Sequence, residues 1–118
     1  MSIALKRAYE KPSKQDGYRV LVDRIWPRGV SKEEADIDEW MKEIAPTDQL
    51  RKLYHDNRIS WGEFRKLYLS ELKENRDNLR PLTEKAEEKK VTLVYGSKDK
   101  EKNNAVVLKQ YLKMLGVE

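Results

Sequence analysis

The stretch that decides the fold is Asp16-Gly17-Tyr18-Arg19-Val20-Leu21-Val22-Asp23-Arg24-Ile25-Trp26-Pro27-Arg28-Gly29. Aromatic and β-branched residues from Tyr18 to Val22 follow an Asp-Gly turn and form a nearly continuous apolar run around Arg19, which predicts a β-strand. Such a run is typical of a strand that is covered on both faces. We therefore expect this strand to lie inside a layered domain.

The residues after this strand leave the sheet abruptly. Pro27 has no backbone donor and disfavours helical geometry at Trp26, and Gly29 permits a backbone turn that residues with a Cβ resist. Asp23, Arg24 and Arg28 are therefore presented at the carboxyl end of the strand. Ligands bind at this end in open sheets with covering helices.

Two further strands complete the fold prediction. Val91-Thr92-Leu93-Val94-Tyr95 is a second apolar run, and Ile3 to Arg7 is a short possible strand. Long helical connections between buried strands favour parallel pairing. The sequence predicts one compact α/β domain over residues 1–118, with a small, mostly parallel sheet of three or four strands covered by about five helices.

The helices are indicated by capping residues and apolar periodicity. A capping box at Asp36 and Glu39, with Ile37, Trp40, Met41 and Ile44 on one face, predicts a helix from 36 to 44. The other expected helices are a turn at 31–34, a short helix after Thr47 that ends near 56–57, one from Ser60 to about Asn75, one from Pro81 to about Lys90, and a last one from 103 or 104 to a cap at Gly116.

Composition limits the classes of function. The chain has 118 residues, no cysteine and one histidine, so thiol nucleophiles and disulfides are excluded, and a transition-metal site is not expected. We predict no cofactor. No apolar run has the length of a membrane span and the first residues do not resemble a signal peptide, so we expect a cytoplasmic protein without a membrane partner.

The distribution of charge favours an anionic partner. The net charge is +4, and residues 1–30 hold seven Lys or Arg against three Asp or Glu. Residues 91–118 hold five against three, whereas the middle of the chain is slightly acidic. The positive excess therefore lies in the expected strands and their loops. Scattered solvated charge is the alternative explanation of this pattern.

The two loops predict an anion-binding site. If the strands from Tyr18 and Val91 are parallel neighbours, both loops lie at one edge of the sheet. Arginines supply bidentate donors, and a helix amino terminus adds backbone N–H groups. The predicted ligand-binding residues, for a phosphate or carboxylate, are Arg24, Arg28, Lys98, Asn103, Tyr18 and Trp26. The loop after Tyr95 lacks the spacing of a nucleotide phosphate loop.

Catalysis and the kind of partner stay open at this point. Asp23 and Asp99 are candidates for general acid or base chemistry, or they hold neighbouring basic side chains in place. Nucleic-acid binding is one alternative, with Trp26 or Tyr18 stacking on a base. A non-catalytic protein-interaction domain is another. The sequence does not decide the oligomeric state.

The motifs of this chain resemble the YeaO-like branch of the family called domain of unknown function 488. The resemblance implies an α/β domain of bacterial or archaeal type with no settled activity. Other branches resemble a form with cysteine where Tyr95 and Asn103 stand, and with histidine and arginine where Asn104 and Ala105 stand, so a thiol, metal or redox role does not carry over. The matching residues are Asp16–Arg24, Trp26–Gly29, Asp38–Trp40, Ala45–Pro46, Phe64, Tyr68, Glu71–Leu72, Thr92–Leu93, Lys98–Asp99 and Asn103–Leu108.

Overall fold

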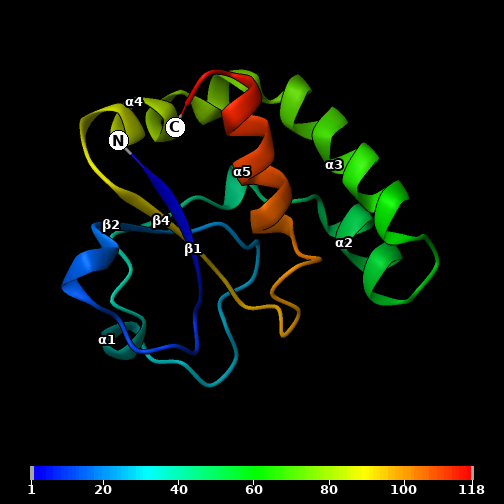
Figure 1. Ribbon diagram of the computed structural model, residues 1–118. Coiled ribbons are helices and arrows are strands. Elements are labelled where there is room, and N and C mark those ends of the chain that lie inside the picture. The colour runs from blue at the N-terminus through cyan, green and yellow to red at the C-terminus, as the bar shows by residue number, and fades with distance from the viewer. Residues whose placement is uncertain (1, 118) are drawn as a thin grey trace.

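The fold is a parallel sheet with helices packed on one face (Figure 1). The computed structural model describes residues 2–117. The elements in chain order are β1 (Ile3–Arg7), η1 (Lys14–Asp16), β2 (Tyr18–Leu21), α1 (Lys32–Ala35), β3 (Glu39–Trp40), η2 (Lys42–Ile44), α2 (Asp48–His55), α3 (Trp61–Glu74), η3 (Arg76–Leu79), α4 (Arg80–Glu88), β4 (Val91–Tyr95) and α5 (Asn104–Met114).

The strands lie in the order β1-β4-β2-β3, and every neighbouring pair is parallel. Leu93 in the central strand β4 is level with Leu5 of β1 and Val20 of β2. The predicted α/β class with a small parallel sheet is confirmed. Because all strands run the same way, the residues after β1, β2 and β4 meet at one edge of the sheet.

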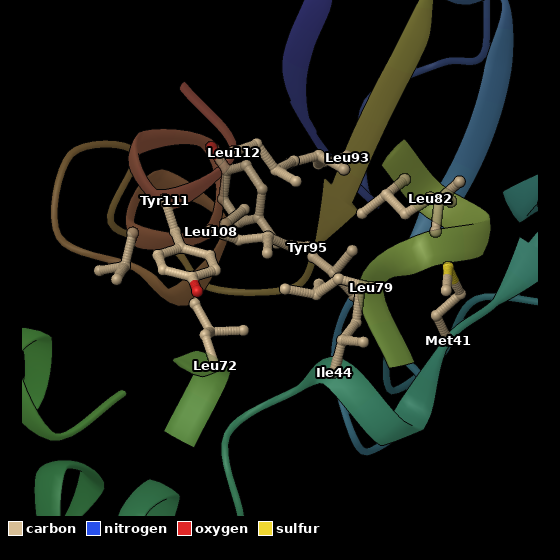
Figure 2. Packing of buried hydrophobic residues seen from close by; sticks show 14 of the residues in the cluster. Met41, Ile44, Leu72, Leu79, Leu82, Leu93, Tyr95, Leu108, Tyr111 and Leu112 are labelled. Carbon is tan, nitrogen blue, oxygen red and sulfur yellow. The ribbon is translucent and has the colours of Figure 1, made fainter. Parts of the chain in front are cut away.

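The larger core lies between the sheet and helices α3, α4 and α5. Val20 and Leu93 point into it from the sheet. Figure 2 shows Leu93 and Tyr95 of β4 beside residues of α3, α4, α5, η2 and η3, which include Leu72, Leu82, Leu108 and Leu112. Burial of large apolar side chains, each worth about 1.5–3 kcal/mol, makes this layer the main source of stability.

The opposite face of the sheet carries a smaller core. Leu21 and Val94, one residue along from Val20 and Leu93, point to this face because side chains alternate along a strand. They pack against Trp26 and Ile37, in the irregular segments on either side of α1, and against Trp40 of β3. Figure 1 shows α1 below the strands and α3, α4 and α5 above them. Both faces of β2 are therefore covered, as its apolar run indicated.

The predicted helix from 36 to 44 is wrong. Asp36 has a left-handed backbone (φ 49°) and ends α1, and β3 then pairs with β2. The backbone N–H of Asp38 donates to the Arg19 carbonyl over 2.9 Å, and that of Met41 donates to the Leu21 carbonyl over 3.0 Å. The outer edge of β2 needs these hydrogen bonds, so tertiary pairing overrides the local helical pattern.

The other helix signals are confirmed. Thr47, Ser60 and Asn103 each accept a hydrogen bond from a backbone N–H in the first turn of the helix that follows. Pro81 lies in the first turn of α4, where a missing N–H costs nothing. Gly116, beyond the end of α5, has a positive φ of 88° that favours glycine.

A buried ion pair holds the amino-terminal edge of the sheet. Arg19 is 2% exposed, and its Nη1 donates to the Asp16 carboxylate over 2.6 Å. Its other guanidinium nitrogens donate to the carbonyls of Ala35 and Asp36. Lys6 also donates to Asp16, over 3.1 Å. This network ties β1, β2 and α1 together, and every donor nitrogen of the Arg19 side chain has an acceptor.

Candidate functional site

Asp23 and Gly96 meet at the carboxyl edge of the sheet. The Gly96 N–H donates to Asp23 Oδ2 over 2.8 Å, and the Asn104 Nδ2 amide donates to Asp23 Oδ1 over 3.0 Å. Burial raises the pKa of Asp23, and the bonds from Asn104 and Gly96 oppose that rise. A Cβ on residue 96 would lie 3.1 Å from Asp23 Oδ2, so glycine permits this close approach. The parallel pairing does bring the two predicted loops together.

Asp99 and Asn103 are used inside their own loop. Asp99 Oδ1 accepts from the N–H groups of Glu101 and Lys102, and these bonds lower the pKa of Asp99. Asn103 is 3% exposed; its Nδ2 donates to the Asp99 carbonyl over 2.8 Å and its Oδ1 accepts from Val106. Both groups of the Asn103 side-chain amide are therefore hydrogen-bonded within the protein, and its predicted role in ligand binding stays a prediction.

Arg24 is turned toward a neighbouring loop. Its Nε donates to the Pro46 carbonyl over 2.9 Å, and its Nη2 donates to the Ala45 carbonyl over 3.3 Å. Tyr68 donates to the Ile44 carbonyl in the same loop over 2.6 Å. The sequence predicted Arg24 as a ligand donor, but the structure uses two of its donors to hold residues 44–46 against β2.

Trp26 and Tyr18 are also committed elsewhere. The Trp26 indole donates to the Val30 carbonyl over 2.6 Å, and its ring meets Trp40 edge-on at 5.4 Å. Tyr18 is the first residue of β2, so it lies at the amino-terminal edge, about 16 Å along the strand direction from Asp23. Its hydroxyl donates to Glu39 Oε1 over 2.9 Å. Tyr18 is therefore separated from the predicted site, and the indole N–H of Trp26 already has an acceptor within the protein.

Contacts around Tyr9 connect loops that carry basic residues. Arg7, the last residue of β1, donates from Nε to the Ser97 carbonyl over 2.7 Å, and its Cζ lies 5.0 Å from the centre of the Tyr9 ring. The Tyr9 hydroxyl donates to the Arg28 carbonyl over 2.9 Å. Lys98 directly follows Ser97. These contacts connect the loops after β1, β2 and β4, and we call Arg7, Tyr9, Arg28 and Lys98 the basic edge.

The basic edge keeps donors available to a ligand. Arg28 and Lys98 are exposed, and within residues 2–117 their side chains make no hydrogen bond or ion pair. Arg7 uses only Nε. Tyr9 is 48% exposed. The sequence predicted Arg28 and Lys98 but missed Arg7 and Tyr9, although the predicted strand Ile3–Arg7 already placed Arg7 at the carboxyl edge if that strand were parallel.

The remaining candidates for chemistry lie outside this edge. His55 is exposed at the end of α2, and its Nδ1 lies 3.4 Å from Asp56 Oδ1. In the part of the chain that the structure describes, no group of three or more His, Cys, Asp or Glu residues is arranged to hold a metal ion. No helix in this part is both long enough and apolar enough to cross a membrane.

Comparisons with known proteins agree on one family. A family model described as the inactive DUF488-N3 subclade matches residues 2–115. The chain is 41% identical over 115 residues to the uncharacterized protein YeaO of Escherichia coli K12, which covers 98% of this chain and 100% of that relative. It is 37% identical over 112 residues to the uncharacterized protein Rv3073c of Mycobacterium tuberculosis H37Rv, covering 93% and 92% of the two chains. No solved structure matches.

Proposed function

Because this chain belongs to the inactive DUF488-N3 subclade, as its YeaO-like motifs predicted, we propose that it is a non-catalytic protein that binds a small anion at the basic edge. The anion is a phosphate or carboxylate group. The observation that carries the proposal is the chain of contacts from Ser97 through Arg7 and Tyr9 to Arg28.

The chemistry of the described residues supports a binding role rather than a catalytic one. The chain contains no cysteine, and its one histidine is exposed beside Asp56. Asp23 and Asp99 both accept bonds from backbone N–H groups, and each stabilises a loop. A general base needs a nucleophile or substrate proton within hydrogen-bond reach. Neither carboxylate is paired in this way with a Ser, Thr or Tyr hydroxyl in the range 2–117.

The donors of the basic edge suit an oxyanion. Arginine presents several N–H groups in a fixed plane, which matches the oxygens of a carboxylate or phosphate, and lysine adds a mobile charge. Tyr9 contacts the Arg7 guanidinium and donates to the Arg28 carbonyl, so it links the two loops that carry these arginines.

Nucleic-acid binding has less support from the same contacts. The two aromatic residues that this hypothesis needed for stacking, Trp26 and Tyr18, donate hydrogen bonds within the protein, and Tyr18 lies at the opposite edge of the sheet from the basic edge. An oligonucleotide would also require a row of cations along several phosphates. The basic edge supplies only three cations, from three loops at one end of the sheet, which suits one or two oxyanions better than a run of phosphates.

Calorimetric titration with inorganic phosphate and citrate at fixed ionic strength tests the proposal. The test variant is Arg28→Gln/Lys98→Gln, and the matched control is Arg58→Gln/Lys113→Gln, which removes the same charge from exposed positions elsewhere. Each lost charged donor should weaken binding by about 1.5–3 kcal/mol, roughly tenfold or more. Equal affinities in the two variants would refute the proposal. A steeply salt-dependent preference for oligonucleotides would replace it.

A further inference from the structure

The outer edge of β1 leaves part of its backbone without protein partners. β1 lies at one end of the sheet, and within residues 2–117 only β4 pairs with it. The Val91 N–H donates to the Ser2 carbonyl, and the Ala8 N–H donates to the Tyr95 carbonyl. The even-numbered residues of this stretch therefore turn their backbone groups toward β4, and the odd-numbered residues turn theirs away from the sheet.

A turn closes one end of this outer edge. The Arg7 N–H donates to Glu10 Oε2 over 3.0 Å, and the Glu10 N–H donates to the Arg7 carbonyl over 3.1 Å. Ile3 and Leu5 differ from Arg7, since in the described part of the chain their outward N–H and carbonyl groups make no hydrogen bond. Such a row of unpaired groups is a template for pairing with another strand.

The unpaired groups are complementary to those of a second copy of the chain. In an antiparallel pair, facing residues that exchange two backbone hydrogen bonds alternate with facing residues that exchange none. If two copies of β1 meet with Ala4 opposite Ala4, Ile3 of each copy faces Leu5 of the other. This register satisfies every outward donor and acceptor of Ile3 and Leu5 in both copies. A register centred on Leu5 would instead place Ile3 opposite Arg7, whose N–H already has a partner.

The side chains fit the same register. Ile3 lies in the larger core and Leu5 packs against it, so contacts between Ile3 and Leu5 of two copies would join the two cores. Ala4 points to the other face of the strand, and its small side chain permits the close approach of a facing pair without hydrogen bonds. Exposed lysines commonly protect an edge strand, but Lys6 is paired with Asp16 over 3.1 Å.

We infer that the outer edge of β1 is a homodimer interface, at which two copies pair their β1 strands antiparallel about a two-fold axis at Ala4. The two four-stranded sheets then form one continuous sheet. Because the paired strands run in opposite directions, the two basic edges lie at opposite ends of the dimer, and the pairing does not depend on anion binding. A contact centred on one short strand is small, and small interfaces are weak, so the dimer should dissociate on dilution.

Sedimentation equilibrium over a range of protein concentrations tests the pairing. The mass should rise from 14.0 kDa, that of one chain, toward twice this value between micromolar and millimolar concentration. Ala4→Glu and Ala4→Lys each place two like charges opposite each other at the axis, so either variant alone should dimerise several-fold more weakly. An equimolar mixture should recover the dimer, because glutamate then faces lysine. Ser70→Glu, at an exposed position of α3, is the control and should dimerise like the original protein.

Hydrogen exchange observes the outward groups directly. In the original protein, the amides of Ile3 and Leu5 should exchange slowly at high concentration and quickly on dilution, whereas those of Ala4 and Lys6, which face β4, should stay protected. This measurement decides the question even where a charge at residue 4 prevents folding. A mass of one chain at every concentration, exchange at Ile3 and Leu5 that is independent of concentration, or a dimer that neither charge variant weakens would overturn the inference. Each of these results would leave the proposed anion site standing.

Discussion

The side-chain amide of Asn104 lies 3.0 Å from Asp23 Oδ1 and 3.0 Å from the Val22 carbonyl, and so joins the start of α5 to the end of β2. The bonded residues are 81 and 82 positions apart in the chain. Asp23 also accepts a hydrogen bond from the Gly96 N–H, so this one carboxylate connects the end of β2, the loop after β4 and the start of α5. These hydrogen bonds connect the loops after β2 and β4 with the start of α5 at the edge that carries the basic residues.

Loss of the Asn104 amide should destabilise the fold. Asn104→Ala leaves Asp23 Oδ1 and the Val22 carbonyl without their donor, and an unsatisfied buried acceptor costs about 1–3 kcal/mol. Urea unfolding measures the change, with Asn78→Ala at an exposed position as the control. A free energy of unfolding equal to that of the control would show that the hydrogen bonds of the Asn104 amide contribute nothing to stability.

Substitutions of Arg24 and Arg28 should have different effects, the first on stability and the second on phosphate binding. Arg24→Met removes the donors to Ala45 and Pro46 and should lower the free energy of unfolding by about 1.5–3 kcal/mol, with little change in phosphate affinity. Arg28→Met should weaken phosphate binding and leave the free energy of unfolding nearly unchanged, because the Arg28 side chain is exposed. Unfolding and titration of both variants check this. Loss of phosphate affinity in Arg24→Met alone would instead restore the role that the sequence predicted for Arg24.

Most of the fold could be predicted from local signals in the sequence. The apolar runs of β2 and β4 indicate strands that are buried on both faces, and the capping residues Thr47 and Ser60 indicate where helices start. Both features depend on residues that are close together in the sequence, so they can be read from it directly. The segment from 36 to 44 could not be predicted in this way. Its conformation is set by hydrogen bonds to Arg19 and Leu21, which lie about twenty positions away.

The arrangement of the candidate site residues could be predicted in part for the same reason. Parallel pairing placed Arg28 and Lys98 at one edge, as the strand pattern indicated. The pattern did not show which arginine would turn inward, since the partners of Arg24 are carbonyls in a loop of unpredicted shape.

The Asp16–Arg19 pair should make stability depend on pH. Burial alone would raise the pKa of Asp16, but bonds from Ser13, Lys6 and Arg19 outweigh it and hold the pKa below its ordinary value of 3.8. The stabilisation is therefore complete above that value and is lost as the pH falls through the folded-state pKa. Asp16→Asn should cost about 3 kcal/mol at pH 7, since it leaves Arg19 buried without its counter-ion. Urea unfolding should show this difference shrinking below about pH 3.8; a constant difference would contradict the assignment.

Replacement of Arg51 should not harm the fold. Arg51→Met removes a buried donor that has no acceptor in the described chain, so the free energy of unfolding should stay constant or rise by up to about 1 kcal/mol. Thermal unfolding of Arg51→Met beside Arg58→Met tests the sign. A loss of more than about 1 kcal/mol would identify Arg51 as a structural residue.

The measurement that tests the central claim most directly is the mapping of amide chemical shifts while inorganic phosphate is added at fixed ionic strength. The account predicts saturable shifts concentrated at Arg7, Tyr9, Arg28, Ser97 and Lys98, with the amino-terminal edge around Tyr18 unchanged. In the same titration of the Arg28→Gln/Lys98→Gln variant, these shifts should be smaller and should need more phosphate to saturate. Shifts that fail to saturate, or that gather at other basic residues such as Arg76 and Arg80, would contradict the assignment of the basic edge as an anion site.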